Sequence, residues 1–135
     1  MPAGYSTNPL SKKLGLKENF QALLINAPDH YISLLEDITD KLSFNPKTTN
    51  GLDFIHLFTN SQQELEMMLP TLKQQIKKEG MIWVSWYKKA SGKPTHLTEN
   101  MIRESGLSIG LVDVKICAVD TDWSGLKFVC RLKDR

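Results

Sequence analysis

An alternation of short apolar runs with segments of helical period constrains this chain more than any other feature. Three runs are almost entirely apolar: Gln21–Asn26, Leu52–Thr59 and Met81–Trp86. Such runs are typical of strands that are covered on both faces of a parallel sheet. Because strand–helix–strand units are nearly always right-handed and parallel, the alternation predicts an α/β fold with a doubly wound, mostly parallel sheet.

The segment after the first run predicts a helix. It opens at Pro28 and Asp29 and should end near Lys41. Its apolar positions lie three or four residues apart, as on the buried face of a helix: Tyr31, Leu34, Leu35 and Ile38.

A second helix is expected after the run that ends at Thr59. Ser61 is suited to the N-cap, and Glu64 completes a capping-box pattern three residues later. Pro70 lies inside the helical pattern and should kink or divide the helix, because proline has no amide proton to donate. Gly80 is expected to end it.

The last third of the chain predicts one more helix and a hairpin. Thr98 caps the helix Glu99–Ser105, which Gly106 should end. Val112–Val119 and Leu126–Leu132 then read as two antiparallel strands joined by a tight turn, closing the sheet.

The length of 135 residues favours one hydrophobic core. Residues 1–10 are rich in Gly, Pro, Ser, Thr and Asn and are expected to form a flexible arm. Residues 11–135 should form a single three-layer domain with five or six strands. Within it, residues 11–14 predict one helical turn closed by Gly15, and Leu42–Asn45 a short edge strand.

Charge and composition exclude several kinds of protein. The net charge of +2 lacks the strongly basic face of a nucleic-acid protein, and no apolar stretch is long enough for a signal peptide or a membrane span. We therefore expect a cytoplasmic protein that binds neither nucleic acid nor membrane. Cys117 and Cys130 lie in apolar runs without metal-site spacing, so buried free thiols are expected and no metal site.

The topology resembles the C-terminal half of class I methyltransferases, which have a Rossmann-like fold. The resemblance rests on a glycine before a Trp-containing strand (Gly80-Met81-Ile82-Trp83-Val84), a helix ending in Glu-Ser-Gly, and a terminal hairpin. It implies that the last strand inserts antiparallel between its two predecessors, giving a strand order such as 2-1-3-4-6-5.

Seven motifs also resemble those of a small bacterial family, the one catalogued as domain of unknown function 3052. They are Gly4-Tyr5-Ser6, Lys13-Leu14-Gly15, Gly80-Met81-Ile82-Trp83-Val84, Lys88-Lys89-Ala90-Ser91-Gly92-Lys93-Pro94, Leu97-Thr98-Glu99-Asn100, Gly110-Leu111-Val112-Asp113-Val114-Lys115 and Asp122-Trp123-Ser124-Gly125-Leu126. The resemblance covers nearly the whole chain. It implies no activity.

The turn after the first run lacks the glycine of cofactor-binding folds. Methyltransferases and dinucleotide-binding folds place glycines there so that the backbone can approach the cofactor closely. Here the turn is Asn26-Ala27-Pro28-Asp29, in which Pro28 removes an amide donor and Asp29 adds a negative charge. We therefore expect no cofactor, and methyl transfer would require an altered site.

The loop after Trp86 is the main candidate site. It follows a central strand, at the sheet edge where open α/β folds bind ligands. Its lysines, hydroxyls and histidine could hold a phosphate or a carboxylate: Lys88, Lys89, Ser91, Lys93 and His96. The alternative is that these lysines are simply solvated. The spacing is not that of a phosphate-binding Walker loop.

The histidines and serines give no complete catalytic set. His56 lies inside an apolar run and favours a hydrogen-bonded core residue. His30 and His96 both follow carboxyl ends of strands and could approach one another at the ligand edge, where Asp29 could orient one of them. Ser85 and Ser91 lack the flanking glycines of a nucleophile elbow.

The hairpin turn holds a second cluster, Asp120, Asp122 and Trp123. Asp residues suit a tight turn and Trp123 could cover the end of the core. Alternatively, Trp123 and Asp122 could contact a partner protein if the ring is exposed.

Three functional hypotheses follow. The first is a non-catalytic binding or regulatory module for a small anionic ligand or a protein partner, centred on the loop after Trp86 and with His30 nearby. The second is an enzyme, either a degenerate methyltransferase or a hydrolase that uses His30 or His96. The third is a self-associating protein, and both a monomer and a homodimer are compatible with the sequence.

Overall fold

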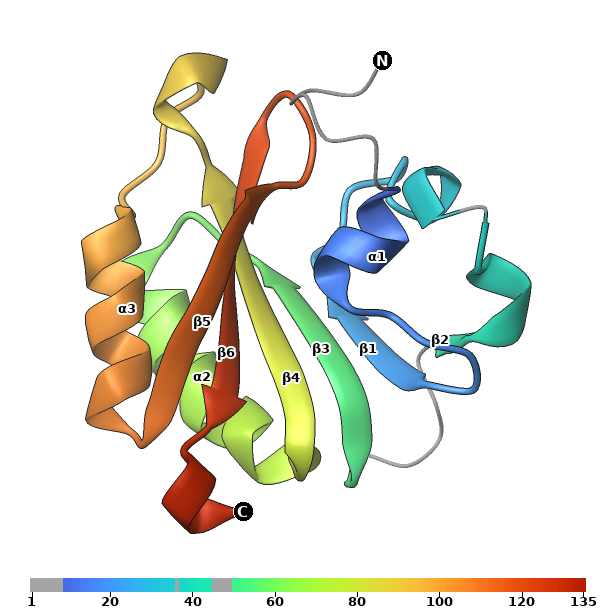
Figure 1. Ribbon diagram of the computed structural model, residues 1–135. Coiled ribbons are helices and arrows are strands. Elements are labelled where there is room, and N and C mark those ends of the chain that lie inside the picture. Colours follow the sequence, from blue (N-terminus) through green and yellow to red (C-terminus); the bar gives the residue numbers. More distant parts are fainter. Residues whose placement is uncertain (1–8, 36, 45–49) are drawn as a thin grey trace.

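The three apolar runs form neighbouring parallel strands at the centre of one six-stranded sheet. The computed structural model describes residues 9–35, 37–44 and 50–135. The strand order is β2-β1-β3-β4-β6-β5, the order implied by the methyltransferase resemblance (Figure 1). The strands are β1 (Gln21–Ile25), β2 (Ser43–Phe44), β3 (Leu52–Phe58), β4 (Ile76–Tyr87), β5 (Leu111–Ala118) and β6 (Trp123–Cys130).

The pairing confirms a mostly parallel sheet closed by an antiparallel hairpin. β1 pairs in parallel with β2 and β3, and β3 pairs in parallel with β4. β6 runs antiparallel to both β4 and β5, between which it is inserted. The carboxyl ends of β1, β3 and β4 therefore meet at one edge of the sheet, together with the turn that joins β5 to β6.

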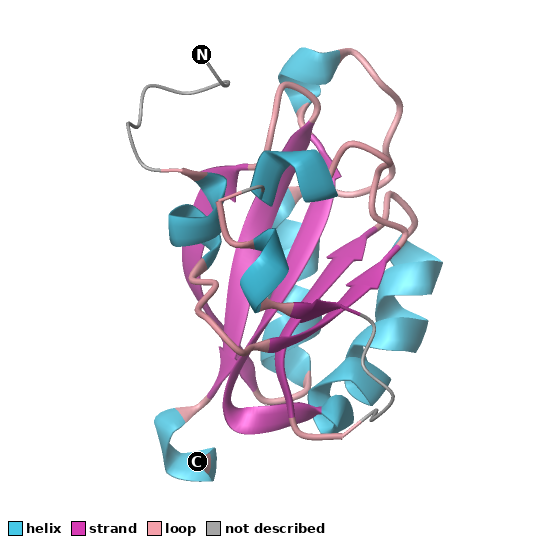
Figure 2. Cartoon of the chain, turned by 90° about the vertical axis from the view of Figure 1, so that its right-hand side faces the viewer, coloured by secondary structure: helices cyan, strands magenta, loops and turns pink. Residues whose placement is uncertain are grey.

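Helices cover both faces of the sheet, so the three-layer α/β prediction is confirmed (Figures 1 and 2). On one face lie α2 (Gln62–Gln75) and α3 (Glu99–Ser108). On the other lie α1 (Leu10–Leu14) and two short 3-10 turns, η1 (Ile32–Leu35) and η2 (Thr39–Lys41). Each face has its own cluster of buried apolar side chains. No helix in the described ranges is long and apolar enough to cross a membrane.

The predicted helix from Pro28 to Lys41 is wrong, because η1 and η2 replace it. Backbone amides in this segment bond to carbonyls three residues back, as in the bond from Leu34 N to Tyr31 O, 3.0 Å long. The hydroxyl of Thr39 also bonds to the carbonyl of Leu35, at 2.6 Å, and so competes with the helical pattern. The apolar positions were nevertheless identified correctly, since Tyr31 and Leu35 are fully buried.

α2 is neither divided at Pro70 nor ended by Gly80. Pro70 lies on the exposed side of the helix, where water can satisfy the Glu66 carbonyl that the proline leaves without a donor. Gly80 belongs to β4, at a register shift against β3. A β-carbon on Gly80 would lie 2.9 Å from the carbonyl oxygen of Leu52, so this glycine allows close strand approach.

The end of α3 was also misplaced. Gly106 is buried inside the helix, against Phe128. Glycine is required at this position because a β-carbon there would overlap the Phe128 ring. The left-handed glycine that follows the helix is Gly110, with a φ of 92°.

Other boundaries shift by a few residues. β6 begins at Trp123 instead of Leu126, and α1 begins at Leu10, within the predicted arm, and is followed by Gly15 in a left-handed conformation (φ 81°). The rest of the arm, residues 1–8, and Asn45 of the predicted edge strand lie outside the described residues. Both cysteines are free, Cys130 buried and Cys117 only half-buried.

Candidate functional site

The loop after β4 is fastened to its neighbours along the carboxyl edge of the sheet. The amide of Tyr87 donates to Asn60 Oδ1 at 2.8 Å, and the amide of Lys88 donates to the carbonyl of Asp122 at 2.9 Å. Further along, the amide of His96 donates to the Asn60 carbonyl at 3.0 Å. The loop is therefore anchored to the end of β3 and to the hairpin turn by hydrogen bonds that its own backbone amides donate.

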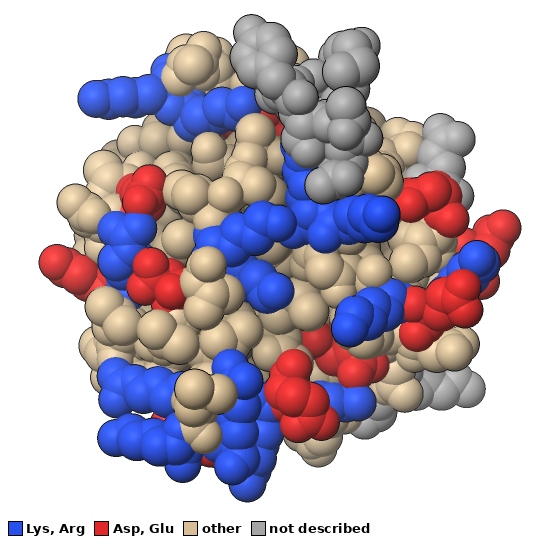
Figure 3. All heavy atoms as spheres, in the orientation of Figure 1, with Lys and Arg blue, Asp and Glu red and all other residues tan. Residues whose placement is uncertain are grey.

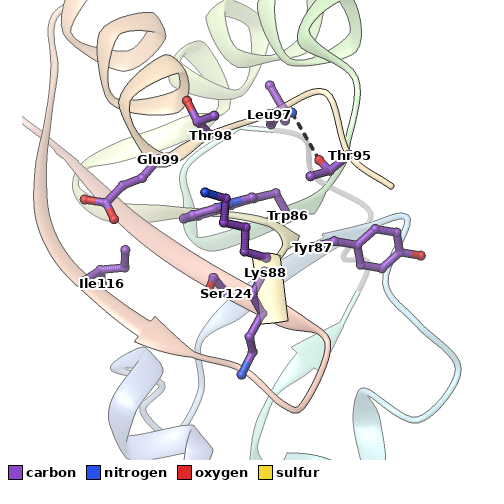
Figure 4. A pocket seen from close by; sticks show the side chains of 10 residues that line it. Trp86, Tyr87, Lys88, Thr95, Leu97, Thr98, Glu99, Ile116 and Ser124 are labelled. Carbon is purple, nitrogen blue, oxygen red and sulfur yellow. Dashed lines mark hydrogen bonds between the residues drawn. The ribbon is translucent and has the colours of Figure 1, made fainter. Parts of the chain in front are cut away.

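This anchored loop borders a hollow of about 470 Å³ between β4, the start of α3 and the hairpin. Trp86 and Leu97 contribute buried apolar side chains, and the Trp86 ring lies in the middle of the lining (Figure 4). We call this hollow the β4 pocket; it is lined by Trp86, Tyr87, Lys88, Lys89, Thr95, Leu97, Thr98, Glu99, Ile116 and Ser124.

The predicted anion-binding residues do not all converge on the β4 pocket. Lys88 and Lys89 line it. Lys93 instead pairs with Asp122 at 3.0 Å and lies over the Tyr87 ring, 5.4 Å from its centroid. The hydrogen bond that the Lys93 ammonium donates to the Asp122 carboxylate raises the pKa of Lys93. Two lysines thus face the pocket, and the third holds the loop to the hairpin.

Ser91 also serves the shape of the loop. Its hydroxyl donates to the carbonyl of Lys88 at 2.7 Å and accepts from the amide of Lys93 at 3.1 Å. The loop then turns at Gly92, which has a φ of 73°. Among the pocket's hydroxyls, Thr98 accepts from the amide of Met101 at 3.3 Å and caps α3 as predicted.

The structure does not bring His30 and His96 together. His30 Nε2 lies 2.6 Å from Asp120 Oδ2, whereas Asp29, the predicted partner, is exposed to solvent. His96 is exposed, and no hydrogen bond or ion pair joins its side chain to His30 in the described part of the chain. The imidazole at this edge is therefore oriented by the hairpin turn, from a residue distant in sequence.

Asp120 organises the turn that holds His30. Its Oδ1 accepts from the amides of Asp122 and Trp123, both at 2.8 Å. Burial raises the pKa of Asp120, but the hydrogen bonds from His30 and from these two amides outweigh that effect and hold the pKa below its usual value. No local pattern in the sequence indicates this pairing, because 90 positions separate His30 from Asp120.

Trp123 covers the end of the core. Its ring packs at 4.3 Å from the Tyr87 ring and at 5.0 Å from the Phe58 ring, measured between centroids. It is half-buried, so part of the ring remains on the surface. The neighbouring Asp122 carboxylate is engaged by Lys93.

His56 is a core histidine with both ring nitrogens hydrogen-bonded, as its place inside an apolar run predicts. It is fully buried, with Nδ1 at 2.8 Å from the Tyr31 hydroxyl and Nε2 at 2.7 Å from the Ser85 hydroxyl. Desolvation lowers the pKa of His56 to about 3 and raises that of Tyr31 well above its usual value. Ser85 and His56 are thus hydrogen-bonded inside the core, out of reach of a substrate.

The turn after β1 was missed as a structural feature. Asn26 has a φ of 60°, the left-handed conformation that usually requires glycine and that Asn tolerates best among the other residues. Its amide group donates to the carbonyl of Phe58 at 3.2 Å and to Glu64 Oε1 at 3.4 Å. The Asn26 side chain therefore crosses from β1 to the end of β3 and the first turn of α2.

Because Asn26 bonds to Glu64, only one of the two hydrogen bonds of the predicted capping box forms. The Ser61 hydroxyl accepts from the Glu64 amide at 3.2 Å, as expected of an N-cap. The return bond is different, because the Ser61 amide donates to Thr59 Oγ1 and the Glu64 carboxylate accepts from Asn26. An Asn directly after an apolar run was the one available signal for the left-handed turn.

Solved structures with a similar fold are class I methyltransferases at low sequence identity. A SAM-dependent methyltransferase from Aquifex aeolicus has a TM-score of 0.60 at 14% identity, over 87% of this chain and 85% of that chain. A TehB-like SAM-dependent methyltransferase from Corynebacterium glutamicum has a TM-score of 0.57 at 9% identity, over 96% and 91% of the two chains.

A third similar structure is the magnesium protoporphyrin IX methyltransferase from Synechocystis with bound SAH. Its TM-score is 0.59 at 10% identity, over 90% of this chain and 78% of that chain. At these identities the likeness shows the fold alone. It confirms the Rossmann-like, methyltransferase-like topology.

Sequence comparison identifies a family but no relative of known activity. No curated protein matches this sequence. A family profile described as "Protein of unknown function (DUF3052)" matches residues 29–132, most of the chain and nearly all of the sheet. The chain therefore belongs to the family of domain of unknown function 3052, built on the fold of class I methyltransferases.

Proposed function

We propose that the protein is a non-catalytic binding or regulatory module that holds a small anionic ligand with an apolar part in the β4 pocket. The observation that carries this proposal is the composition of the pocket. An apolar floor, formed by Trp86 and Leu97, lies beside the two cationic side chains Lys88 and Lys89 at the carboxyl end of a central strand.

The size and chemistry of the pocket suit such a ligand. Its volume of about 470 Å³ falls within the range of small-molecule sites. The apolar floor would bury a ring or a short chain, and each lysine would act as a point charge for a phosphate or carboxylate. The pocket's one carboxylate, Glu99, is engaged by Arg103, so its charge is compensated.

The described residues supply no matching catalytic set around the pocket. The oriented imidazole, His30, has Nε2 bound to Asp120, and no serine or cysteine side chain is hydrogen-bonded to it. The buried pair of His56 and Ser85 is sealed within the core. A binding role requires only the pocket, whereas a hydrolase would require a nucleophile or an activated water beside His30.

A degenerate methyltransferase-like enzyme is the alternative, favoured by the fold of the solved neighbours. Their shared cofactor would approach the crevice at the end of β1, where the sheet reverses its order of connection. The residues here do not fit that approach. The Asn26 side chain bridges the crevice to Phe58 and Glu64, and Pro28 has no amide proton. Asn26 keeps the left-handed backbone that a glycine would adopt at this turn, but its side chain occupies the space that a glycine would leave open.

Isothermal titration calorimetry with 1-naphthyl phosphate tests the proposal, because this probe joins an aromatic ring to a dianion. We expect the wild-type chain to bind it and the Lys88→Gln/Lys89→Gln variant to bind at least about tenfold more weakly. The matched control is Lys78→Gln/Lys133→Gln, which removes the same charge from two exposed lysines. It should bind as the wild type does.

Two results would overturn the proposal. The first is no binding by the wild type at millimolar probe, and the second is an equal loss in both double variants. Titration with S-adenosylmethionine is run in parallel. Binding of this cofactor that is unchanged in Lys88→Gln/Lys89→Gln would favour the methyltransferase-like alternative.

A further inference from the structure

The sheet carries a second cationic site, on the face that α2 and α3 leave uncovered. Lys115 on β5 and Lys127 on β6 are direct cross-strand partners. Neighbouring positions of this kind place the two side chains on the same face, a few ångströms apart, where like charges repel. The pairing follows a register shift between Asp113 and Lys115, so it is specified by the way the hairpin is built.

Two more lysines come from the segment around α1. The Lys115 ammonium donates to the carbonyl of Lys13 at 2.9 Å, which brings β5 against the end of α1. The charges of Lys13 and Lys115 both act on the Cys117 thiol, so the ammonium group of Lys13 also lies near this part of β5. Lys127 lies close by, since a β-carbon on Gly15 would be 3.6 Å from its Nζ. Lys17 is near enough to act electrostatically on Lys127. We call Lys13, Lys17, Lys115 and Lys127 the four-lysine cluster.

The cluster has no carboxylate partner in the described part of the chain. The ion pairs there use other cations, and Glu18, which is adjacent to Lys17 in sequence, pairs with Lys41 at 3.1 Å. Figure 3 shows Lys and Arg side chains gathered in the middle of this face, over β5, β6 and α1. Among the residues that the structure describes, the positive charge is therefore local and uncompensated.

Holding these charges together costs stability in the absence of an anion. Lys127 is half-buried, and its pKa is lowered by desolvation first and then by the charges of Lys115 and Lys17. One exposed lysine on a strand could avoid this cost by turning into solvent, but Lys115 is held at the Lys13 carbonyl. A bound anion would remove the repulsion and favour the charged form of Lys127.

We propose that the four-lysine cluster binds a small, soluble ligand that carries two linked phosphate groups. Four ammonium groups match the charge of a diphosphate, and lysine is well suited to phosphate as a point charge. The cluster is compact and the whole chain has a net charge of only +2, which disfavours a nucleic acid, whose binding needs an extended basic stripe.

This site is distinct from the β4 pocket. Ile116 lines the pocket, whereas its neighbour Lys115 belongs to the cluster, and consecutive residues of a strand point to opposite faces of the sheet. The two sites are therefore separated by the thickness of the sheet. The proposal for the four-lysine cluster can therefore hold even if the proposal for the β4 pocket is wrong, and the reverse is also true.

Calorimetric titration with inorganic pyrophosphate at low ionic strength tests the proposal on the full chain. The Lys115→Gln/Lys127→Gln variant should bind at least about tenfold more weakly than the wild type, because two of four cationic contacts are lost. Lys78→Gln/Lys133→Gln, the charge-matched control, and Lys88→Gln/Lys89→Gln, the pocket variant, should both stay within about twofold of the wild type.

Two further measurements keep the proposal testable if the Lys115→Gln/Lys127→Gln variant does not fold. The single variant Lys17→Gln changes an exposed side chain, and should weaken pyrophosphate binding by about threefold. In the wild type, NMR titration of the Lys127 side chain should show its pKa rising when pyrophosphate is bound.

Four outcomes would overturn the proposal: no pyrophosphate binding by the wild type at millimolar concentration, equal weakening in the charge-matched control, weakening confined to the pocket variant, or tighter binding of a single-stranded RNA than of pyrophosphate at the same ionic strength.

Discussion

The carboxyl ends of β1 and β4 differ, although both follow central parallel strands at the same edge of the sheet. At the end of β1, the Asn26 side chain bonds to Phe58 and Glu64 and bridges the crevice where the sheet reverses its connections. At the end of β4, hydrogen bonds anchor the loop to Asn60 and to the hairpin turn, and the loop borders a hollow of about 470 Å³. The fold is shared with methyltransferases, and the hollow lies at the end of β4 and not at the end of β1.

This difference shows that the strand order and the surfaces at the strand ends are set by different parts of the sequence. The apolar runs determine which strands are central, and the few residues after each strand determine what can approach it. In this chain, a left-handed Asn replaces an open glycine at one strand end, and two lysines beside Trp86 create a cationic apolar surface at another.

The largest expected effect concerns the core beneath the β1 end, where His56 links Tyr31 to Ser85. The folded-state pKa of His56 is about 3, below its ordinary value of 6.5, so the unfolded chain binds the proton first as pH falls. The contribution of His56 to the free energy of unfolding should be constant above about pH 6.5 and decrease below it by up to about 1.4 kcal/mol per pH unit until about pH 3.

Urea unfolding at several pH values measures this slope. His56→Gln keeps a donor and an acceptor in the core but does not titrate, so its stability should lose less on acidification than that of the wild type. If both proteins show the same slope between pH 6.5 and pH 4, buried His56 is not the cause.

The fold could be predicted in outline because apolar periodicity acts over whole elements. The runs around Leu23, Ile55 and Val84 gave the central strands, and the methyltransferase resemblance gave the inserted last strand. The 3-10 turns after Pro28 could not be predicted, because apolar residues three or four apart, such as Tyr31, Leu34 and Leu35, suit both an α-helix and a pair of short 3-10 turns. Local sequence does not distinguish them.

The candidate sites depend on contacts between distant residues, which sequence patterns do not show. The position of Lys88 and Lys89 after a central strand was enough to predict that they lie at this edge of the sheet, where they line the β4 pocket, but the pairing of Lys93 with Asp122 was not visible. The four-lysine cluster was missed because the opposition of Lys115 and Lys127 depends on a register shift in the hairpin.

The second prediction breaks the bridge at the β1 end. Asn26→Ala loses both side-chain hydrogen bonds and strains the left-handed backbone, so we expect a loss of about 2 kcal/mol in the free energy of unfolding. Asn26→Gly loses the same bonds without the strain and should cost about 1 kcal/mol. Urea unfolding compares the two. An equal loss in both variants would show that the left-handed conformation at this position is not maintained.

The third prediction sharpens the account of the β4 pocket. Ile116 lines it and is 45% exposed, so Ile116→Ser should weaken binding of 1-naphthyl phosphate by about threefold, through lost apolar contact, with little change in stability. Val114 lies on the same strand, is 54% exposed and does not line the pocket. Val114→Ser should leave the calorimetric affinity unchanged. An equal loss in both variants would place the probe outside the pocket.

The smallest effect is expected at Lys93. Its ammonium group is paired with Asp122 and half-exposed, so Lys93→Gln should change the affinity for 1-naphthyl phosphate by less than about twofold. A loss as large as that of Lys88→Gln/Lys89→Gln would instead mean that Lys93 leaves Asp122 to contact the ligand. Calorimetry on the three proteins under identical conditions separates these results.

NMR with 15N-labelled protein tests most directly the claim that ligands bind at the end of β4 and not at the end of β1. During titration with 1-naphthyl phosphate, the indole signal of Trp86 and the amide signals of Lys88 and Thr98 should shift together, while those of Asn26 and Asp29 remain in place. Saturable shifts at Asn26 and Asp29, with Trp86 unaffected, would contradict the account.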